Sequence, residues 1–224
     1  MTIISNCQKI ESQIKDNLTA ANRNSEELNC VAVTKQRTIE EMDALYRYGH
    51  RHFGENRPEG LLEKQAVFSQ SDIKWHYIGS LQTRKVKQII NKIDYLHSLD
   101  RESLAKEIDK RAEKPVACFV QVNVSGETSK HGVSPSDLEK FIEQLSVYPN
   151  VLIIGLMTMA PIEATEEELH GYFKKLKDLQ EKIAEKRWAY APCTETSMGM
   201  SGDYPYAIQE GATFIRIGSA FFSE

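Results

Sequence analysis

A lysine ends the most apolar run in the first part of the chain. Residues 30–35 read CVAVTK, which is the composition of a parallel strand buried on both faces. In an α/β barrel the carboxyl ends of the strands carry the active site, so we expect Lys35 to point into the mouth. A lysine partly removed from water loses some of its preference for the charged form, and a neutral amine attacks an aldehyde to form a Schiff base. Position alone leaves a second interpretation open, a lysine that only marks the surface end of a strand.

Glycines flanked by small hydroxyl residues occur twice near the C-terminus. Residues 197–203 read SMGMSGD after the expected seventh strand, and residues 216–219 read RIGS at the end of the eighth. Barrels commonly bind phosphate after these two strands, where hydroxyls and backbone N–H groups converge and glycine lets the backbone approach the ligand. The two segments therefore predict a site for a phosphate-bearing ligand. The alternative is that the glycines serve only turns.

Arg216 lies inside the apolar run FIRI of residues 214–217. A guanidinium is costly to bury there unless it is paired or hydrogen-bonded. One interpretation is a structural ion pair with an inward acid such as Glu195. The other is a hydrogen bond to a ligand acceptor, for which an unprotonated pyridine nitrogen would serve. An arginine in that place would leave such a pyridine ring a weaker electron sink than a carboxylate would.

Three more side chains stand at or near the ends of expected strands. Asn56 follows the second strand, His76 lies on the third and Met157 ends the sixth. Each has a structural alternative: Asn56 could cap a helix that starts near Pro58, His76 could be a satisfied core histidine, and Met157 could fill the barrel.

The elements that must position these residues alternate between β-rich runs and amphipathic helices. A leading helix is expected from Ile3 to about Leu28, outside the repeat, because apolar residues recur there at three-four spacing. The expected strands are Val31–Thr34, His52–Phe53, Trp75–Ile78, Tyr95–Ser98, Val116–Val122, Val151–Met157, Thr194–Ser197 and Phe214–Ile217. Capping pairs mark helix starts at Thr38 with Glu41, Ser134 with Asp137, and Thr165 with Glu168, the last opening a helix that runs to Arg187.

Eight such units most economically close into one (β/α)₈ TIM-type barrel of the α/β class. An open doubly wound sheet is the alternative. No linker rich in proline, glycine or serine divides the chain, so we expect one domain over residues 1–224.

Composition excludes several classes of protein. A formal net charge of −4 gives no general basic field, which disfavours a nucleic-acid partner. No apolar run approaches the roughly 20 residues of a membrane helix, and no signal peptide precedes the barrel, so we expect a cytoplasmic protein without membrane contact.

The four cysteines, Cys7, Cys30, Cys118 and Cys193, are scattered and are expected to be reduced packing residues rather than a disulfide framework or metal site. An acidic exterior without an evident apolar patch favours a monomer.

Seven motifs, in this order along the chain, together resemble the pyridoxal-phosphate homeostasis proteins, single-domain relatives of the alanine racemase barrel. They are AVTK at 32–35, FGEN at 53–56, WHYIGSLQ at 75–82, VN at 122–123 with KHG at 130–132, GLMTMA at 155–160, SMGMS at 197–201 and RIG at 216–218. The resemblance spans nearly the whole chain. It departs from the family after Lys35, where Gln36-Arg37 replaces a second lysine and a proline, and after Asn56, where residues 57–60 replace a longer hydrophobic run.

The resemblance implies a role for each candidate residue. Lys35 would form the Schiff base with pyridoxal 5′-phosphate, and Arg216 would face the pyridine nitrogen. Ser197 or Ser201, with the backbone of Gly218 and Ser219, would hold the phosphate. The residues around the ring would be Asn56, His76 and Met157.

The resemblance also implies a function, that of a carrier and buffer of pyridoxal phosphate which could deliver it to apo-enzymes. An amino-acid racemase using the same cofactor is the first alternative, and a barrel that binds another phosphate is the second. Racemisation needs an acid or base on both faces of the substrate. Two-base racemases of this architecture take the second group, a tyrosine, from a separate domain, and this chain reaches Glu224 just after the eighth strand. The sequence therefore favours a protein without substantial turnover.

Overall fold

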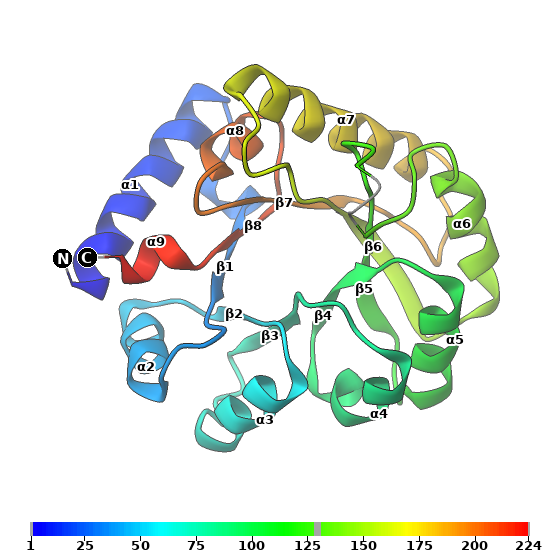
Figure 1. Ribbon diagram of the computed structural model, residues 1–224, viewed down its shortest axis with the longest axis horizontal. Helices are drawn as coiled ribbons and strands as arrows, with labels where there is room; N and C mark the ends of the chain where they lie inside the picture. The colour runs from blue at the N-terminus through cyan, green and yellow to red at the C-terminus, as the bar shows by residue number, and fades with distance from the viewer. Residues whose placement is uncertain (1, 128–130, 224) are drawn as a thin grey trace.

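The computed structural model describes residues 2–127 and 131–223. Eight parallel strands close into a barrel in chain order, and helices surround it (Figure 1). The strands are β1 (Asn29–Val33), β2 (His52–Glu55), β3 (Lys74–Tyr77), β4 (Tyr95–Leu99), β5 (Val116–Gln121), β6 (Val151–Met157), β7 (Glu195–Met200) and β8 (Phe214–Ile217). The expected TIM-type barrel is confirmed, and the open sheet is wrong because β1 pairs with β8 as well as with β2.

The helices occupy the connections between strands and the two ends of the chain. They are α1 (Ile3–Ala20), α2 (Ile39–Tyr48), α3 (Pro58–Val67), α4 (Val86–Ile89), α5 (Glu102–Arg111), α6 (Leu138–Gln144), α7 (Glu166–Ala184), α8 (Tyr204–Gln209) and α9 (Ser219–Phe222). The additional N-terminal helix α1 packs beside α8 and α9, which brings the two ends of the chain together (Figure 1). No helix in the described ranges is both long and apolar enough to cross a membrane.

Two of the three expected helix starts are confirmed. Thr38 and Thr165 each accept a hydrogen bond from the backbone N–H three residues on, and the glutamate at that position bonds back. The third is wrong, because the Ser134 hydroxyl accepts from the Asp137 N–H in a turn that precedes α6, and the helix begins only at Leu138.

The leading helix is shorter than its apolar spacing predicts. It ends at Ala20 rather than near Leu28, because Asn22 adopts a left-handed conformation with φ of 52°. A 3₁₀ turn over Ser25–Glu27 then leads into β1.

Two strands extend past their expected ends through glycine. β2 continues to Glu55 because Gly54 and Glu55 pair with β3, and β7 continues to Met200, which pairs with Arg216 on β8. Partner strands supply this pairing, which a local pattern does not contain.

The apolar core has two parts. The larger part lies between the strands and the helices, and a small cluster of Val31, Phe119, Met157 and Phe214 fills the inside of the barrel. The four cysteines are free thiols, as expected, and burial raises the pKa of Cys118 to about 12, which makes it a poor nucleophile.

Candidate functional site

A cavity of about 540 Å³ opens at the carboxyl ends of the strands. Seven of the nine predicted site residues line it: Lys35, Asn56, Met157, Ser201, Arg216, Gly218 and Ser219. A second cavity of about 310 Å³ shares Lys35, Gly218 and Ser219 with the first and adds Gln36 and Arg37. Closure of the barrel therefore brings residues that follow β1 next to residues that follow β8, although they are far apart in the sequence.

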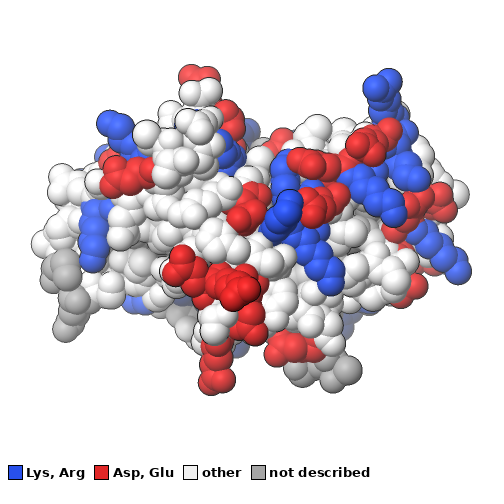
Figure 2. All heavy atoms as spheres, turned by 90° about the horizontal axis from the view of Figure 1, so that it is seen from above, with Lys and Arg blue, Asp and Glu red and all other residues white. Residues whose placement is uncertain are grey.

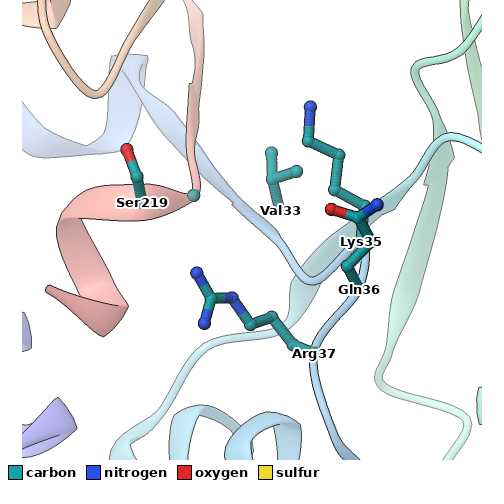
Figure 3. A pocket seen from close by; sticks show the side chains of 6 residues that line it. Val33, Lys35, Gln36, Arg37 and Ser219 are labelled. Atoms are coloured by element: carbon teal, nitrogen blue, oxygen red, sulfur yellow. The ribbon is translucent and has the colours of Figure 1, made fainter.

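Lys35 lies in a tight turn directly after β1. The Arg37 N–H donates to the Thr34 carbonyl at 3.0 Å, and Gln36 adopts a left-handed φ of 60°, which is uncommon for a residue with a side chain. Figure 3 shows Lys35 extending away from Arg37, whose guanidinium lies 4.3 Å from the ring centre of Phe222. The Lys35 side chain is exposed, so the partial removal from water that we expected is not found.

A buried ion pair supports this turn from behind. Lys64 on α3 contacts Glu55 and donates to the Thr34 carbonyl at 2.7 Å, while the Thr34 hydroxyl donates to Glu55 at 2.7 Å. The side chains of Lys64 and Glu55 are 5% and 2% exposed. This pair was not predicted from the sequence, although a glutamate that ends a buried strand needs a partner. The pair joins the backbone before Lys35 to the end of β2, directly before Asn56.

Arg216 is 5% exposed and holds two neutral acceptors. Its Nη1 donates to Ser197 Oγ at 2.6 Å, and its Nη2 donates to the Thr158 carbonyl at 3.0 Å. Burial lowers the pKa of Arg216 to about 10, an effect that Asp203 partly opposes. Arg216 also lines the cavity, and because a guanidinium carries five N–H groups it has donors beyond these two bonds. No ion pair joins Glu195 to Arg216 in the described chain, and the acid that acts on Arg216 through charge is Asp203.

Backbone N–H groups converge where β7 and β8 end. The Ser201 hydroxyl accepts from the N–H groups of Gly218 at 3.1 Å and of Ala220 at 3.3 Å. A side chain on Gly218 would press its first carbon to 3.3 Å from Cβ of Val33, so glycine keeps this corner open. A hydroxyl together with backbone amides is a donor set suited to a phosphate.

Asn56 borders the cavity where two strand ends approach closely. A side chain on Gly79 would come within 2.2 Å of the Asn56 carbonyl oxygen, so only glycine permits this contact. Helix α3 starts at Pro58 with Arg57 in the capping position and no side-chain capping bond. Asn56 is therefore not the helix cap that its position also suggested.

The other two predicted residues, His76 and Ser197, lie below the cavity in the interior of the barrel. Both are fully buried, and neither lines the cavity. They are joined through His97, and His76 also bonds to His52. His52 and His97 were not predicted from the sequence, although three neighbouring strands each carry a histidine at an inward position. Lys130 of the KHG motif lies outside the described residues.

Comparison with known proteins places this geometry in a family. Residues 11–224 match the model of the alanine racemase N-terminal domain. The pyridoxal phosphate homeostasis protein of Aquifex aeolicus is 37% identical over 97% of each chain, and that of Vibrio cholerae is 33% identical over 100% of this chain and 96% of its own. This chain belongs to the pyridoxal phosphate homeostasis protein family.

Solved structures agree with membership of the pyridoxal phosphate homeostasis protein family. PipY of Synechococcus elongatus is 31% identical and superposes with a TM-score of 0.88 without pyridoxal phosphate and 0.87 with it bound, over 99% of this chain and 100% of PipY. Alanine racemase of Corynebacterium glutamicum is 13% identical with a TM-score of 0.68, and this chain covers 60% of it. That likeness shows the shared barrel fold.

Proposed function

We propose that this protein binds pyridoxal 5′-phosphate as a Schiff base on Lys35 and acts in its homeostasis as a carrier and buffer. One observation carries the proposal: a single cavity brings together the amine of Lys35, the guanidinium of Arg216 and the corner formed by Ser201, Gly218 and Ser219. These groups match the aldehyde, the ring nitrogen and the phosphate of the cofactor. When bound, the cofactor would supply the aldehyde that forms the Schiff base, and the residues of the cavity would orient the cofactor.

Each end of the cofactor has its own recognition group in this proposal. Ser201 with the backbone of Gly218 and Ser219 would hold the phosphate, and Asn56 and Met157 would border the ring. Arg216 would donate to the ring nitrogen, so the nitrogen would stay unprotonated. Ser197 and His76 would act on the site only from the interior of the barrel.

The first test is borohydride reduction of the protein incubated with pyridoxal phosphate, followed by peptide mass mapping. We expect loss of the visible absorption band and a phosphopyridoxyl group on Lys35, because reduction turns the Schiff base into a stable amine. Lys35→Ala should carry no adduct, whereas Lys85→Ala, which changes a lysine outside the cavity, should label normally. An adduct on another lysine, or none with excess cofactor, would refute the assignment.

A second prediction concerns the ring nitrogen. Arg216→Glu should change the absorption spectrum of the bound cofactor and raise the pKa of the ring nitrogen, since a carboxylate favours its protonated form. A pH titration of the spectrum, with circular dichroism to verify folding, measures this. An unchanged spectrum and affinity in a folded variant would make Arg216 purely structural.

We further propose that the protein does not turn over amino acids at an enzyme-like rate. Among the described residues that line the cavity there is no tyrosine to act on the second face of a substrate. The observation that favours the racemase alternative is His131, which lines the cavity in the loop after β5, across the barrel from β1. Its side chain is 71% exposed and lies 4.0 Å from Asp100. An imidazole held so loosely in water is poorly positioned for proton transfer.

We also propose that the protein delivers pyridoxal phosphate to apo-enzymes and that it is a monomer. On the face shown in Figure 2, basic side chains lie interspersed with acidic ones. Such a surface offers no broad basic field for nucleic acid, in keeping with the net charge of −4.

A further inference from the structure

Three imidazoles and one hydroxyl form a continuous line through the interior of the barrel. His52 Nδ1 lies 2.9 Å from His76 Nε2, and His76 Nδ1 lies 2.8 Å from His97 Nε2. His97 Nδ1 lies 2.8 Å from Ser197 Oγ, the acceptor of the Arg216 bond. We name these four residues the histidine relay: His52, His76, His97 and Ser197. The relay runs from the half-exposed start of β2 to a residue that bonds the cavity wall.

The relay occupies space that apolar side chains fill elsewhere in the barrel. The His97 ring stacks on Phe119 and the His76 ring on Tyr95, each with ring centres 4.5 Å apart. Burial lowers the pKa of both histidines well below the usual range, and Arg216 lowers that of His97 further. A barrel interior needs no polar group for packing, so buried imidazoles that cost free energy to desolvate indicate another requirement.

The arginine sets the direction of the hydrogen bonds. A guanidinium only donates, so Ser197 Oγ accepts from Arg216, and its own hydrogen is then available to His97 Nδ1. His97 in turn donates from Nε2 to His76, and His76 donates from Nε2 to His52. All three imidazoles are neutral in this arrangement, which is the charge state that burial favours.

We propose that the histidine relay is a positioning device for Arg216 within the cofactor-binding function proposed above. It fixes the hydrogen of Ser197 toward His97 and so keeps the serine oxygen in place as the acceptor of Arg216. The guanidinium, held there and on the Thr158 carbonyl, presents its other donors to the cofactor ring. Chains of this kind strengthen each member bond, because every donor polarises the next.

Protonation of His52 reverses the relay. The groups that face His52 are His76 through a hydrogen bond, Tyr95 and Phe214 through ring contacts, and Asp94 and Lys74 through charge. A second proton on His52 places a hydrogen on Nδ1, toward His76, and each imidazole must then donate in the opposite direction. Ser197 would receive donors from both sides and lose the acceptor for its own hydrogen. Burial lowers the pKa of His52, so this change is expected below about pH 6.5, the ordinary midpoint of histidine.

Nitrogen NMR of protein labelled with ¹⁵N-histidine tests the direction of the relay without any cofactor. The chain has six histidines, and we expect His76 and His97 to be neutral with hydrogen on Nε2 above about pH 6.5. A cationic His97, or hydrogen on its Nδ1, would overturn the proposal.

Variants at the base of the barrel test the coupling to the cavity. His52→Phe removes the last acceptor, so we expect shifted His76 and His97 resonances and a roughly tenfold loss of affinity for pyridoxal phosphate, the effect of about one hydrogen bond. Reversal of the relay displaces Arg216 from the cofactor ring, so the spectrum of the bound cofactor in the unaltered protein should change below about pH 6.5. His52→Gln keeps an acceptor but does not titrate, so it should restore affinity and abolish this spectral change. The matched control is His170→Phe, which removes a histidine bonded to Glu210 outside the barrel.

The outcomes separate the relay from the proposed function. Unchanged resonances and affinity in His52→Phe would refute positioning, and a spectral pH profile that survives His52→Gln would refute the reversal. Failure of the unaltered protein to bind pyridoxal phosphate would instead refute the proposed function, while the NMR result would still decide the direction of the relay.

Discussion

Cofactor-loaded protein incubated with L- or D-alanine in deuterated water should invert the configuration at the α-carbon more slowly than about one event per second. An enzyme of ordinary efficiency turns over about ten times per second, and absence of one positioned acid or base lowers a rate by roughly 10²–10⁴-fold. The physical reason is that Lys35 can serve one face of the substrate only. Deuterium incorporation, chirality and keto-acid formation are followed for alanine and a panel of other amino acids.

Two variants identify the residue responsible for any inversion that is observed. Lys35→Ala should abolish it, because that amine is the base nearest the proposed link, and His131→Gln should leave it unchanged. Inversion faster than about one event per second that is lost in Lys35→Ala would establish a racemase-like enzyme. Loss in His131→Gln as well would identify the second base.

Lys64→Ala should lower the free energy of unfolding by about 3–5 kcal/mol, the usual cost of leaving a buried charge without its partner. The substitution strands the Glu55 carboxylate and removes the donor to the Thr34 carbonyl. Urea denaturation followed by circular dichroism measures the change. Labelling of Lys35 by borohydride should also fall, because the turn that carries it loses its support.

The matched control for this pair is Lys85→Ala, which breaks a comparable contact with Glu59 at 2.9 Å on the surface. Water screens that pair, so the free energy of unfolding should hardly change. The double variant Lys64→Met with Glu55→Gln should recover part of the loss, since no charge is then buried unpaired. A Lys64→Ala variant as stable as the control would show that the buried pair contributes nothing to the turn.

The barrel itself was predictable because its signals are local. The buried run CVAVTK, the strand β6 and the capping pairs at Thr38 and Thr165 each show their role within a few residues. The predicted ends of elements were wrong where a residue from another part of the chain determines the end. Gly54 and Gly199 continue their strands only because partner strands pair beyond them, and Ser134 bonds within a turn rather than at a helix end.

Some residues of the candidate site were predictable from the sequence, and others were not. Residue type and strand-end position made Lys35, Arg216, Ser201 and Gly218 candidates, and these residues line one cavity because closure of parallel strands brings their carboxyl ends to one mouth. The sequence left Ser197 and Ser201 as equal candidates for the phosphate. Only the structure separates them, placing one inside the barrel and the other on the backbone amides of the mouth.

What the sequence by itself determined is therefore the barrel, its family and the main residues of the cavity, since these depend on periodicity and on ordered motifs. Tertiary structure alone decided which polar groups meet. The Lys64–Glu55 pair and the histidine relay join residues from different strands and helices, at distances that depend on the tilt and packing of the whole barrel. Buried polar groups are stable only with partners, and a partner is defined by position in space rather than along the chain.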